Sequence, residues 1–193
     1  MITVILGGAR SGKSTYAENL AREGARHGGV VYLATADALD QEMEKRIQIH
    51  KTRRPSDWRT WEGDIETLPD EIKKLSGTIL LDCLTMYMSR LFLSSPEAEG
   101  DDENAWFGAE SKILCMVEKI FSSFIESPDR NDGDHLIVVS NEVGYGLVPT
   151  YQMGRRFRDM QGRANQTAAR YADNVALVVA GLPLHIKGDG IRH

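Results

Sequence analysis

Eight residues near the start of the chain, GGARSGKS, have the composition and spacing of a phosphate-binding loop. Gly7, Gly12, Lys13 and Ser14 satisfy the pattern G-x-x-x-x-G-K-S/T, with an apolar run before the loop and a helical pattern after it. Glycines let the backbone curl so that amide hydrogens point at phosphate oxygens, and the positive end of the following helix adds to the attraction. Lys13 would reach the terminal phosphates and Ser14 would ligate Mg²⁺. The motif indicates a nucleoside triphosphate site.

A second segment with reactive groups is KRIQIHKTRRP, residues 45–55, where one imidazole, His50, lies among fixed positive charges. The cations are Lys45, Arg46, Lys51, Arg53 and Arg54. One interpretation is a solvated, charged helix face that happens to include a histidine. The other is a cationic site for phosphate beside a nucleophile, because a neutral imidazole attacks an α-phosphate and the phosphoramidate can pass its nucleotide on. The rest of the chain has to decide between them.

Two carboxylates follow predicted strands, at the sheet edge where open α/β sheets bind ligands. Asp82 ends the run TILLD, the position at which an enzyme with a phosphate-binding loop holds a carboxylate for Mg²⁺ or its water. Glu142 follows HLIVVS and would either orient a substrate hydroxyl or simply cap its loop. Asp82 is therefore a candidate for the nucleotide site, and Glu142 is a candidate for contact with the substrate.

Four arginines lie on a predicted helix in YQMGRRFRDMQGRANQ. Arg155 and Arg158 are three residues apart, whereas Arg156 and Arg163 are seven apart, so the four form two stripes and not one surface. Contact with phosphate or with a neighbouring subunit is one role for them. We expect at least half of them to be ordinary solvated helix surface.

Short runs rich in Val, Ile and Leu alternate with longer segments of helical period. The predicted strands are 2–6, 30–35, 78–82, 135–140 and 174–180, and the predicted helices are 13–26, 40–53, 64–75, 83–93, 104–126 and 152–172. This alternation is typical of an α/β fold with a mostly parallel central sheet and helices on both faces. Together with the phosphate-binding loop it predicts a single P-loop NTPase domain of RecA-like type over residues 1–193.

Composition excludes several classes of protein. A net charge of -5 and a pI near 5.6 argue against sequence-independent binding of nucleic acid. The longest apolar runs are too short to span a bilayer and the start of the chain has no signal-like core, so we expect a soluble, cytoplasmic protein. Cys83 and Cys115 lack zinc-site spacing and are expected to be buried. The acidic segment 94–104 is expected to be a solvated linker, with a metal site as the alternative.

Several motifs, in order along nearly the whole chain, resemble the bifunctional adenosylcobinamide kinase/adenosylcobinamide-phosphate guanylyltransferase family of cobalamin biosynthesis. They are GGARSGKS, YLATAD at 32–37, RIQIHKTRRP at 46–55, WRTWE at 58–62, ILLDCLT at 79–85, SNEVGYGLVP at 140–149 and GRRFRDMQGRANQ at 154–166. The resemblance implies two reactions: phosphorylation of adenosylcobinamide by ATP or GTP, then transfer of GMP from GTP to adenosylcobinamide phosphate. It also implies a homotrimer.

The resemblance assigns site residues by position. In this family GMP travels through a covalent histidine, and the matching residue is His50. The phosphates would be held by Gly7, Gly8, Ala9, Arg10, Ser11, Gly12, Lys13 and Ser14. The rest of the nucleotide site would comprise Ala34, Thr35, Ala36, Lys51, Thr52, Arg53, Arg54, Glu62 and Asp82, with Ser14 and Asp82 as the Mg²⁺ ligands. The other histidines, His27, His135, His185 and His193, lack the cationic setting of His50.

Two alternative functions stay open at this point. The first is a RecA-type ATPase or switch that acts on nucleic acid, although the net charge does not favour it. The second is a small-metabolite kinase that transfers only the γ-phosphoryl group. Covalent chemistry at His50 distinguishes the bifunctional enzyme from this second alternative.

Overall fold

The computed structural model describes residues 1–25, 29–37, 41–98, 100 and 102–188. The side chains of Glu42, Met43, Arg46, His50, Arg53 and Ala98 lie outside this description. Among the described helices, none is long and apolar enough to cross a membrane.

One seven-stranded sheet forms the centre of the fold, with strand order β3-β2-β4-β5-β1-β6-β7. The strands are β1 (Ile2–Gly7), β2 (Val30–Ala34), β3 (Arg59–Trp61), β4 (Thr78–Asp82), β5 (His135–Asn141), β6 (Asn174–Val179) and β7 (Leu182–Lys187). All neighbouring pairs are parallel except β6 and β7, which form an antiparallel hairpin. The predicted mostly parallel α/β sheet is confirmed. The carboxyl ends of β4, β5 and β1 therefore lie next to one another.

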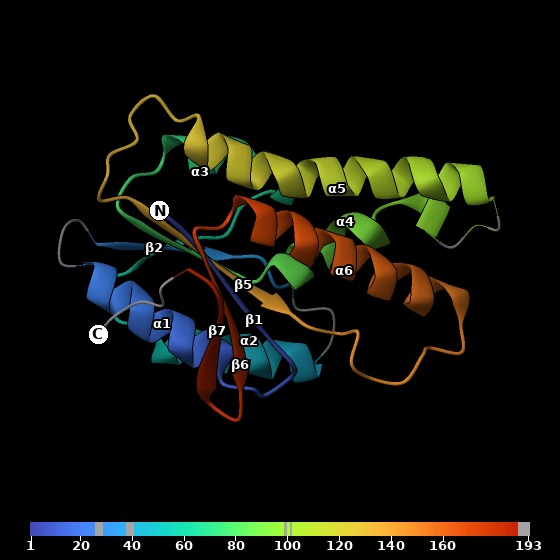
Figure 1. Cartoon of the computed structure of the whole chain (residues 1–193), viewed down its shortest axis with the longest axis horizontal. Coiled ribbons are helices and arrows are strands. Elements are labelled where there is room, and N and C mark those ends of the chain that lie inside the picture. The colour runs from blue at the N-terminus through green and yellow to red at the C-terminus, as the bar shows by residue number, and fades with distance from the viewer. Residues whose placement is uncertain (26–28, 38–40, 99, 101, 189–193) are drawn as a thin grey trace.

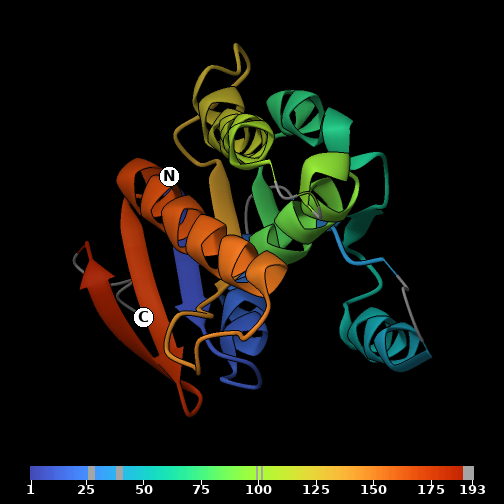
Figure 2. The same ribbon diagram turned by 90° about the vertical axis from the view of Figure 1, so that its right-hand side faces the viewer.

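Helices cover both faces of the sheet, as Figures 1 and 2 show. They are α1 (Lys13–Gly24), α2 (Gln41–Arg53), α3 (Leu68–Lys74), α4 (Leu84–Leu93), α5 (Glu103–Ile125) and α6 (Gln152–Tyr171), with short 3-10 turns η2 (Ile65–Thr67) and η3 (Pro96–Ala98). Helix α1 packs on one face, and α3 to α6 pack on the other. In Figure 2, α2 (teal) stands apart from both layers.

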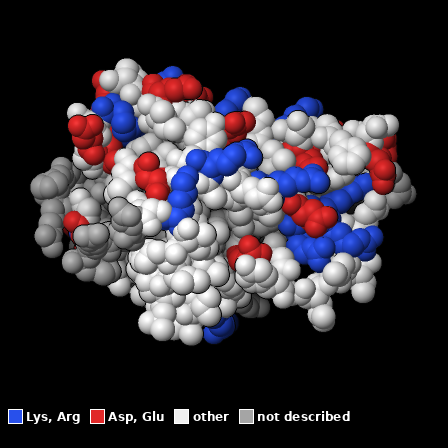
Figure 3. Space-filling view, viewed as in Figure 1, with Lys and Arg blue, Asp and Glu red and all other residues white. Residues whose placement is uncertain are grey.

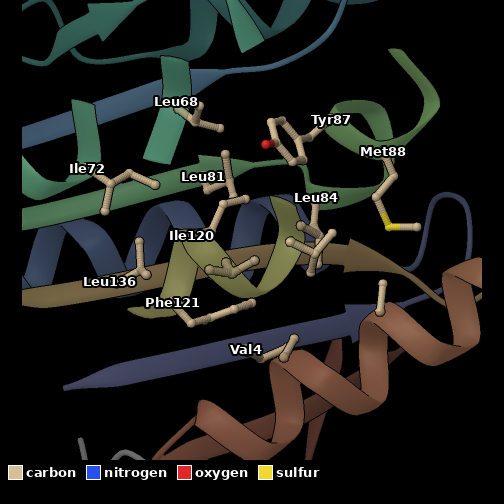
Figure 4. Close-up of a cluster of buried hydrophobic side chains, with 14 of the residues drawn as sticks. Val4, Leu68, Ile72, Leu81, Leu84, Tyr87, Met88, Ile120, Phe121 and Leu136 are labelled. Carbon is tan, nitrogen blue, oxygen red and sulfur yellow. The ribbon is translucent and has the colours of Figure 1, made fainter. Parts of the chain in front are cut away.

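Two hydrophobic clusters hold these layers together. The larger lies between the sheet and α3 to α6, and Figure 4 shows Leu81 and Leu136 from the strands facing Ile120 and Phe121 of α5. The smaller joins α1 to the opposite face through Ile5, Leu80 and Val139. Alternate residues of each central strand enter opposite clusters, since successive side chains of a strand point to opposite faces.

Two strands were not predicted from the sequence. Strand β3 has only three residues, and strand β7 is largely exposed. Pro183 in β7 is tolerated because this strand lies at the edge of the sheet. The predicted helix 64–75 is divided into η2 and α3, and Asp64 caps η2 by accepting a hydrogen bond from the amide of Glu66. The remaining predicted elements agree with the structure to within two residues.

A buried polar cluster fastens the amino end of β5. The carboxylate of Asp134 accepts hydrogen bonds from the amides of Gly77 (2.6 Å) and Asn131 (2.9 Å) and from Arg130 (3.3 Å). His135, next to it, shares a hydrogen bond of 2.8 Å with the Thr3 hydroxyl of β1. Burial would raise the pKa of Asp134, but the two amides and Arg130 lower it below its ordinary value. The carboxylate therefore stays charged while His135 beside it is buried.

The His135 imidazole makes the stability of the fold sensitive to mild acid. Burial, followed by the positive charge of the Met1 amino group, lowers its pKa to about 4 from about 6.5 in an unfolded chain. Between these values the unfolded state binds the proton and the folded state does not, so stability is complete above pH 6.5 and is lost as the pH falls. We expect the free energy of unfolding to drop by about 2 kcal/mol between pH 7 and pH 5.

Urea denaturation of the wild type and of His135→Asn at both pH values measures this dependence. The variant should lose much less stability over the same interval, because asparagine does not titrate. Asp134 should not contribute there, since its pKa is lowered. Equal losses in the two proteins would contradict the assignment to His135.

Candidate active site

The phosphate-binding loop requires glycine at two positions for two different reasons. Gly12 has φ +94, a left-handed conformation, and a Cβ added there would lie 3.0 Å from the Cα of Gly181. A Cβ added at Gly7 would lie 2.8 Å from the carbonyl oxygen of Val178. The loop is also tied to this hairpin, because the amide of Gly181 donates to the carbonyl of Ser11 (2.8 Å). The β6–β7 hairpin thus packs against the loop and leaves no room for a side chain at Gly7 or Gly12.

Lys13 and Ser14 form the first turn of α1, directly after Gly12. The Lys13 ammonium folds back over the loop and donates to the carbonyl of Gly8 (3.2 Å). Lys13 and Ser14 both line the same pocket at the carboxyl edge of the sheet. The aligned peptide dipoles of α1 give this end of the helix a partial positive charge, so the site favours phosphate.

Asp82 forms the opposite side of the site at the end of β4. Its carboxylate accepts a hydrogen bond of 2.8 Å from the Tyr32 hydroxyl, and Arg54 stacks on the Tyr32 ring, with 3.7 Å between the guanidinium carbon and the ring centroid. Burial and then the negative charge of Asp82 raise the pKa of Tyr32 above its ordinary value. Tyr32 therefore stays protonated and orients Asp82.

The pocket between these groups has a volume of about 480 Å³. Its lining comprises Lys13, Ser14, Tyr32, Ala34, Ala36, Asp37, Glu44, Ile47, Gln48, Lys51, Arg54, Glu62, Gly63, Asp82, Cys83, Met86, Arg90 and Asn141. It therefore joins the phosphate-binding loop, the ends of β2, β4 and β5, and one face of α2. A nucleoside triphosphate fits a pocket of this size.

The predicted residues of segment 34–36 do not all face the pocket. Ala34 and Ala36 line it, whereas Thr35 is fully buried. The Thr35 hydroxyl donates to the carbonyl of Cys83 (2.7 Å) and accepts from its amide (2.9 Å). Thr35 thus ties the end of β2 to the end of β4, so its side chain supports the pocket from behind.

Helix α2 contributes residues at spacings of three and four to the pocket wall: Glu44, Ile47, Gln48 and Lys51. Lys51 pairs with Glu62 across the pocket mouth at 2.8 Å, so both predicted residues are present there. The backbone of His50 lies in the same helical turn as Ile47 and Lys51. The side chains of His50, Arg46 and Arg53 are outside the described part of the chain. Thr52 is exposed and donates to the carbonyl of Ile49 (3.0 Å).

The described residues offer few other nucleophiles at this site. Cys83 lines the pocket, but burial and then the nearby Asp82 raise the pKa of its thiol to about 12. His135 lies at the opposite end of β5, and His185 is exposed on β7. His27 and His193 lie outside the described residues. Thiolate chemistry at Cys83 is therefore disfavoured.

Three further predictions concern parts of the chain outside the pocket: Cys115, Glu142 and the acidic segment 94–104. Cys115 is exposed, so its predicted burial is wrong. It lies on the solvent-facing side of α5, where the position of a residue in the helical repeat, and not its apolar character, determines its exposure. Glu142 accepts a hydrogen bond from the amide of Gly144 (2.6 Å) and thus caps its own loop. In the acidic segment 94–104, Asp102 caps α5, and the described residues contain no cluster of three or more potential metal ligands.

The four arginines of α6 have partners within the chain. Arg155 donates to the carbonyls of Pro149 and Thr150, Arg158 contacts Asp159, and Arg163 pairs with Glu110 at 2.5 Å. Arg156 is buried, donates to the Gly100 carbonyl and lies over the Trp106 ring, so it is not solvated surface. On the face shown in Figure 3, basic and acidic side chains lie interspersed and form no uniform basic surface.

Ser14 and Asp82 meet the requirements of a magnesium site that is completed by substrate. Mg²⁺ prefers oxygen ligands and is commonly held by one or two protein groups together with phosphates of the nucleotide. The Ser14 hydroxyl and the Asp82 carboxylate line one pocket, and Tyr32 occupies only one carboxylate oxygen of Asp82. The donor set therefore fits the ion.

Sequence reasoning missed several pocket residues. Tyr32, Asp37 and Arg90 line the pocket, and Arg90 pairs with Asp37 at 2.6 Å. Asn141, the last residue of β5, also lines it. The alternation of β5 would have identified Asn141, since Ile137 and Val139 face the α1 side and Asn141 is the next residue in that series.

The loop geometry predicts different effects for two glycines with similar backbone conformations. Gly29 has φ +82 but open space around it, whereas Gly12 has φ +94 and touches Gly181. Alanine at either position should cost about 1 kcal/mol of stability for the left-handed conformation. Only Gly12→Ala should also weaken nucleotide binding, by at least about tenfold, because the loop must shift.

Calorimetric titration with a non-hydrolysable ATP analogue and chemical denaturation of both variants would measure the two effects. Equal affinity of Gly12→Ala and Gly29→Ala for the analogue would contradict this account of the loop.

Comparison with known proteins agrees with this site. A model of the family described as cobinamide kinase / cobinamide phosphate guanyltransferase (CobU) matches residues 3–186. The bifunctional adenosylcobalamin biosynthesis proteins CobU of Escherichia coli and CobP of Pseudomonas aeruginosa are 35% and 39% identical over 97% and 98% of this chain, and over 100% and 99% of their own lengths. CobU of Salmonella typhimurium is 38% identical over 97% of this chain and all of its own length.

A structural neighbour supports the fold. A KaiC-like protein of Pyrococcus horikoshii superimposes with a TM-score of 0.53 at 13% identity, over 100% of this chain and 81% of the other. At that identity the likeness concerns the fold alone, which is the predicted RecA-like P-loop architecture. The family match extends over almost the whole chain and includes the phosphate-binding loop, Asp82 and the α2 segment. The chain therefore belongs to the cobinamide kinase / cobinamide phosphate guanyltransferase family of cobalamin biosynthesis enzymes.

Proposed function

We propose that this protein catalyses two successive reactions at one nucleotide site. It first transfers the γ-phosphoryl group of ATP or GTP to the hydroxyl of the aminopropanol arm of adenosylcobinamide. It then transfers GMP from GTP to adenosylcobinamide phosphate, which gives adenosylcobinamide-GDP and pyrophosphate. The observation that carries the proposal is that the phosphate-binding loop and the basic α2 segment border one pocket.

In the kinase reaction the protein positions phosphates and offsets their charge. The loop amides from Gly7 to Ser14 and the Lys13 ammonium hold the β- and γ-phosphates. Ser14 and Asp82 would hold Mg²⁺, which neutralises charge on the phosphate oxygens. Lys13, bonded to a loop carbonyl at 3.2 Å, can turn to the nucleotide at little cost because that contact is exposed.

In the guanylyl reaction His50 is the nucleophile. Its imidazole nitrogen forms a bond to the α-phosphorus of GTP, and the bond from that phosphorus to the oxygen bridging the β-phosphate breaks, so pyrophosphate leaves. The acceptor phosphate then displaces the imidazole and takes the GMP. Lys51 and Arg54, which both line the pocket, offset the charge of the departing pyrophosphate.

Family membership and the described residues also support a proposal for the setting of the enzyme. We propose a homotrimer that acts in the cytoplasm without a nucleic-acid partner. The exposed Cys115 and the buried Cys83 are both free thiols, as in proteins of reducing compartments. On the face shown in Figure 3, the interspersed charges of the described residues do not form the basic stripe typical of proteins that bind nucleic acid.

A single phosphate site predicts that one substitution removes both activities. Lys13→Ala should lower the rates of phosphorylation and of guanylylation by about 10²-fold or more, because both reactions lose the same charge at the β- and γ-phosphates. Steady-state assays of each step, with Lys119→Ala of α5 as the exposed-lysine control, measure this effect. Near-normal guanylylation by Lys13→Ala would reveal a second nucleotide site.

The role of His50 predicts a covalent adduct. Incubation with α-labelled GTP and Mg²⁺ should give protein-bound GMP that is labile to acid and stable to base, as expected of a phosphorus–nitrogen bond. His50→Ala should abolish the adduct and spare much of the kinase rate, because γ-phosphoryl transfer needs no histidine intermediate.

His185→Ala is the matched control, since His185 is an exposed histidine on β7. It should form the adduct at the wild-type rate. Mass spectrometry should locate the GMP group on the peptide that contains His50. Label on a lysine, or an adduct that survives His50→Ala, would favour the simple kinase.

A further inference from the structure

Asn141 ends β5, the strand between the phosphate-binding loop and Asp82, and has no role in the reactions described above. In the sheet it is paired with Gly7 of β1, the first glycine of the loop. Ile137 and Val139 of the same strand pack on the α1 side, so alternation directs Asn141 to that side as well. Asn141 accordingly lines the nucleotide pocket together with Lys13, Ser14 and Asp82.

The backbone of Asn141 is held by side chains from two helices. Its amide donates to the Thr85 hydroxyl of α4 (2.8 Å), and its carbonyl accepts from the Asn165 side chain of α6 (3.1 Å). The next amide, that of Glu142, donates to the carbonyl of Gly7 (3.0 Å). The peptide groups on either side of Asn141 are thus fixed relative to α4, α6 and the loop.

A buried network on the opposite face of β5 orients these supporting groups. Ser140 donates to Asn165 (2.7 Å), and Gln161 donates to both Ser140 and Asn165 (3.0 Å each). Thr85 and Ser140 share a further contact of 3.4 Å. All four side chains are buried within the large apolar layer. Burying so many polar groups is unfavourable unless they are hydrogen-bonded to one another. Together these four side chains hold the backbone of residue 141 in a fixed position.

The chemistry of a side-chain amide fits the terminal phosphate. Ser14 and Asp82 would hold Mg²⁺, which would offset charge on the triphosphate, and Asn141 shares their pocket. Its Nδ2 is a neutral donor, which can bind a γ-phosphoryl oxygen without a second full charge beside Lys13. Such a donor is most effective where charge moves during the reaction.

We infer that Asn141 is a catalytic residue of the kinase step, and that Thr85, Ser140, Gln161 and Asn165 are its positioning residues; this rests on the proposed function. In that step the acceptor hydroxyl oxygen bonds to the γ-phosphorus, and the bond from phosphorus to the β,γ-bridging oxygen breaks. The electron pair stays on the departing nucleoside diphosphate, and the hydroxyl proton passes to water. Asn141 Nδ2 donates to a γ-phosphoryl oxygen throughout. In guanylyl transfer the bond that breaks lies at the α-phosphorus, so the same donor contributes less.

The test compares Asn141→Ala and Asn141→Asp with the wild type in both half-reactions. With ATP and adenosylcobinamide, each variant should show kcat lowered by about 10²-fold, because one transition-state donor is lost. Asn141→Asp keeps the shape but lacks the donor, so it should be no more active than alanine. Formation of the covalent GMP adduct from GTP should fall by less than about tenfold in either variant.

A pair of isosteric substitutions tests the positioning network. Thr85→Val and Thr3→Val each remove one buried hydroxyl from the same sheet system, and Thr3 lies at the amino end of β1. Both should lower Tm similarly. Only Thr85→Val should lower the kinase kcat, by about tenfold, with little change in KM for ATP. Equal kcat for the two variants would contradict the positioning role.

The outcomes separate this inference from the proposal on which it rests. If the wild type phosphorylates adenosylcobinamide and Asn141→Ala does so within about threefold of the same kcat, the inference is wrong and the proposed function stands. Equal losses in phosphorylation and adduct formation would also overturn it, because they would indicate general nucleotide binding. A wild type without either activity would refute the proposed function, and the inference with it.

Discussion

The parallel pairing of β5 with β1 on one side and β4 on the other determines the rest of the structure. A parallel strand in the middle of a sheet must bury side chains on both faces, so these three strands are almost continuously apolar. Their register also brings their carboxyl ends to one edge. The phosphate-binding loop, Asp82 and the end of β5 become neighbours there although they are far apart in the sequence.

Polar side chains of this apolar sheet lie mainly at its two ends, and β5 has one set of them at its amino end and another at its carboxyl end. At its amino end, Asp134 binds loop amides and His135 binds Thr3, which ties the loops before β4 and β5 and the start of β1 to the strand. At its carboxyl end, Ser140 and the amides of α6 form a bonded network behind the pocket. Most of these groups are hydrogen-bonded, as burial requires, although the Oε1 atom of Gln161 has no partner among the described residues. One set stabilises the fold, and the other orients groups that face the nucleotide.

The sequence predicted most of the fold because its signals are local. Buried strands appear as apolar runs, helices show their period, and the phosphate-binding loop is a contiguous motif. Strand β3 escaped prediction because three residues, Arg59–Trp61, leave no periodic pattern, and β7 because its apolar residues Leu182, Leu184 and Ile186 face solvent. Thr35 was assigned to the nucleotide site by position, but the direction of its side chain depends on a hydrogen bond to Cys83 that no local pattern contains. Asn141 lies in the motif SNEVGYGLVP, and the alternation of β5 gives the face to which it points, but only the sheet order shows that it shares a pocket with Lys13 and Asp82.

The contact between the β6–β7 turn and the phosphate-binding loop has a consequence for the order in which the site can form. The loop occupies residues 7–14, whereas the atoms closest to a Cβ added at Gly12 belong to Gly181 and Val178, which come much later in the sequence. The amide of Gly181 also donates to the carbonyl of Ser11. A ribosome would therefore release the loop long before the turn that shapes it. Until residues 178–182 emerge, the nascent chain has the motif without the finished cradle. Stabilisation by bound nucleotide thus acts on chains whose sheet is fully assembled and gives little advantage to partly synthesised ones.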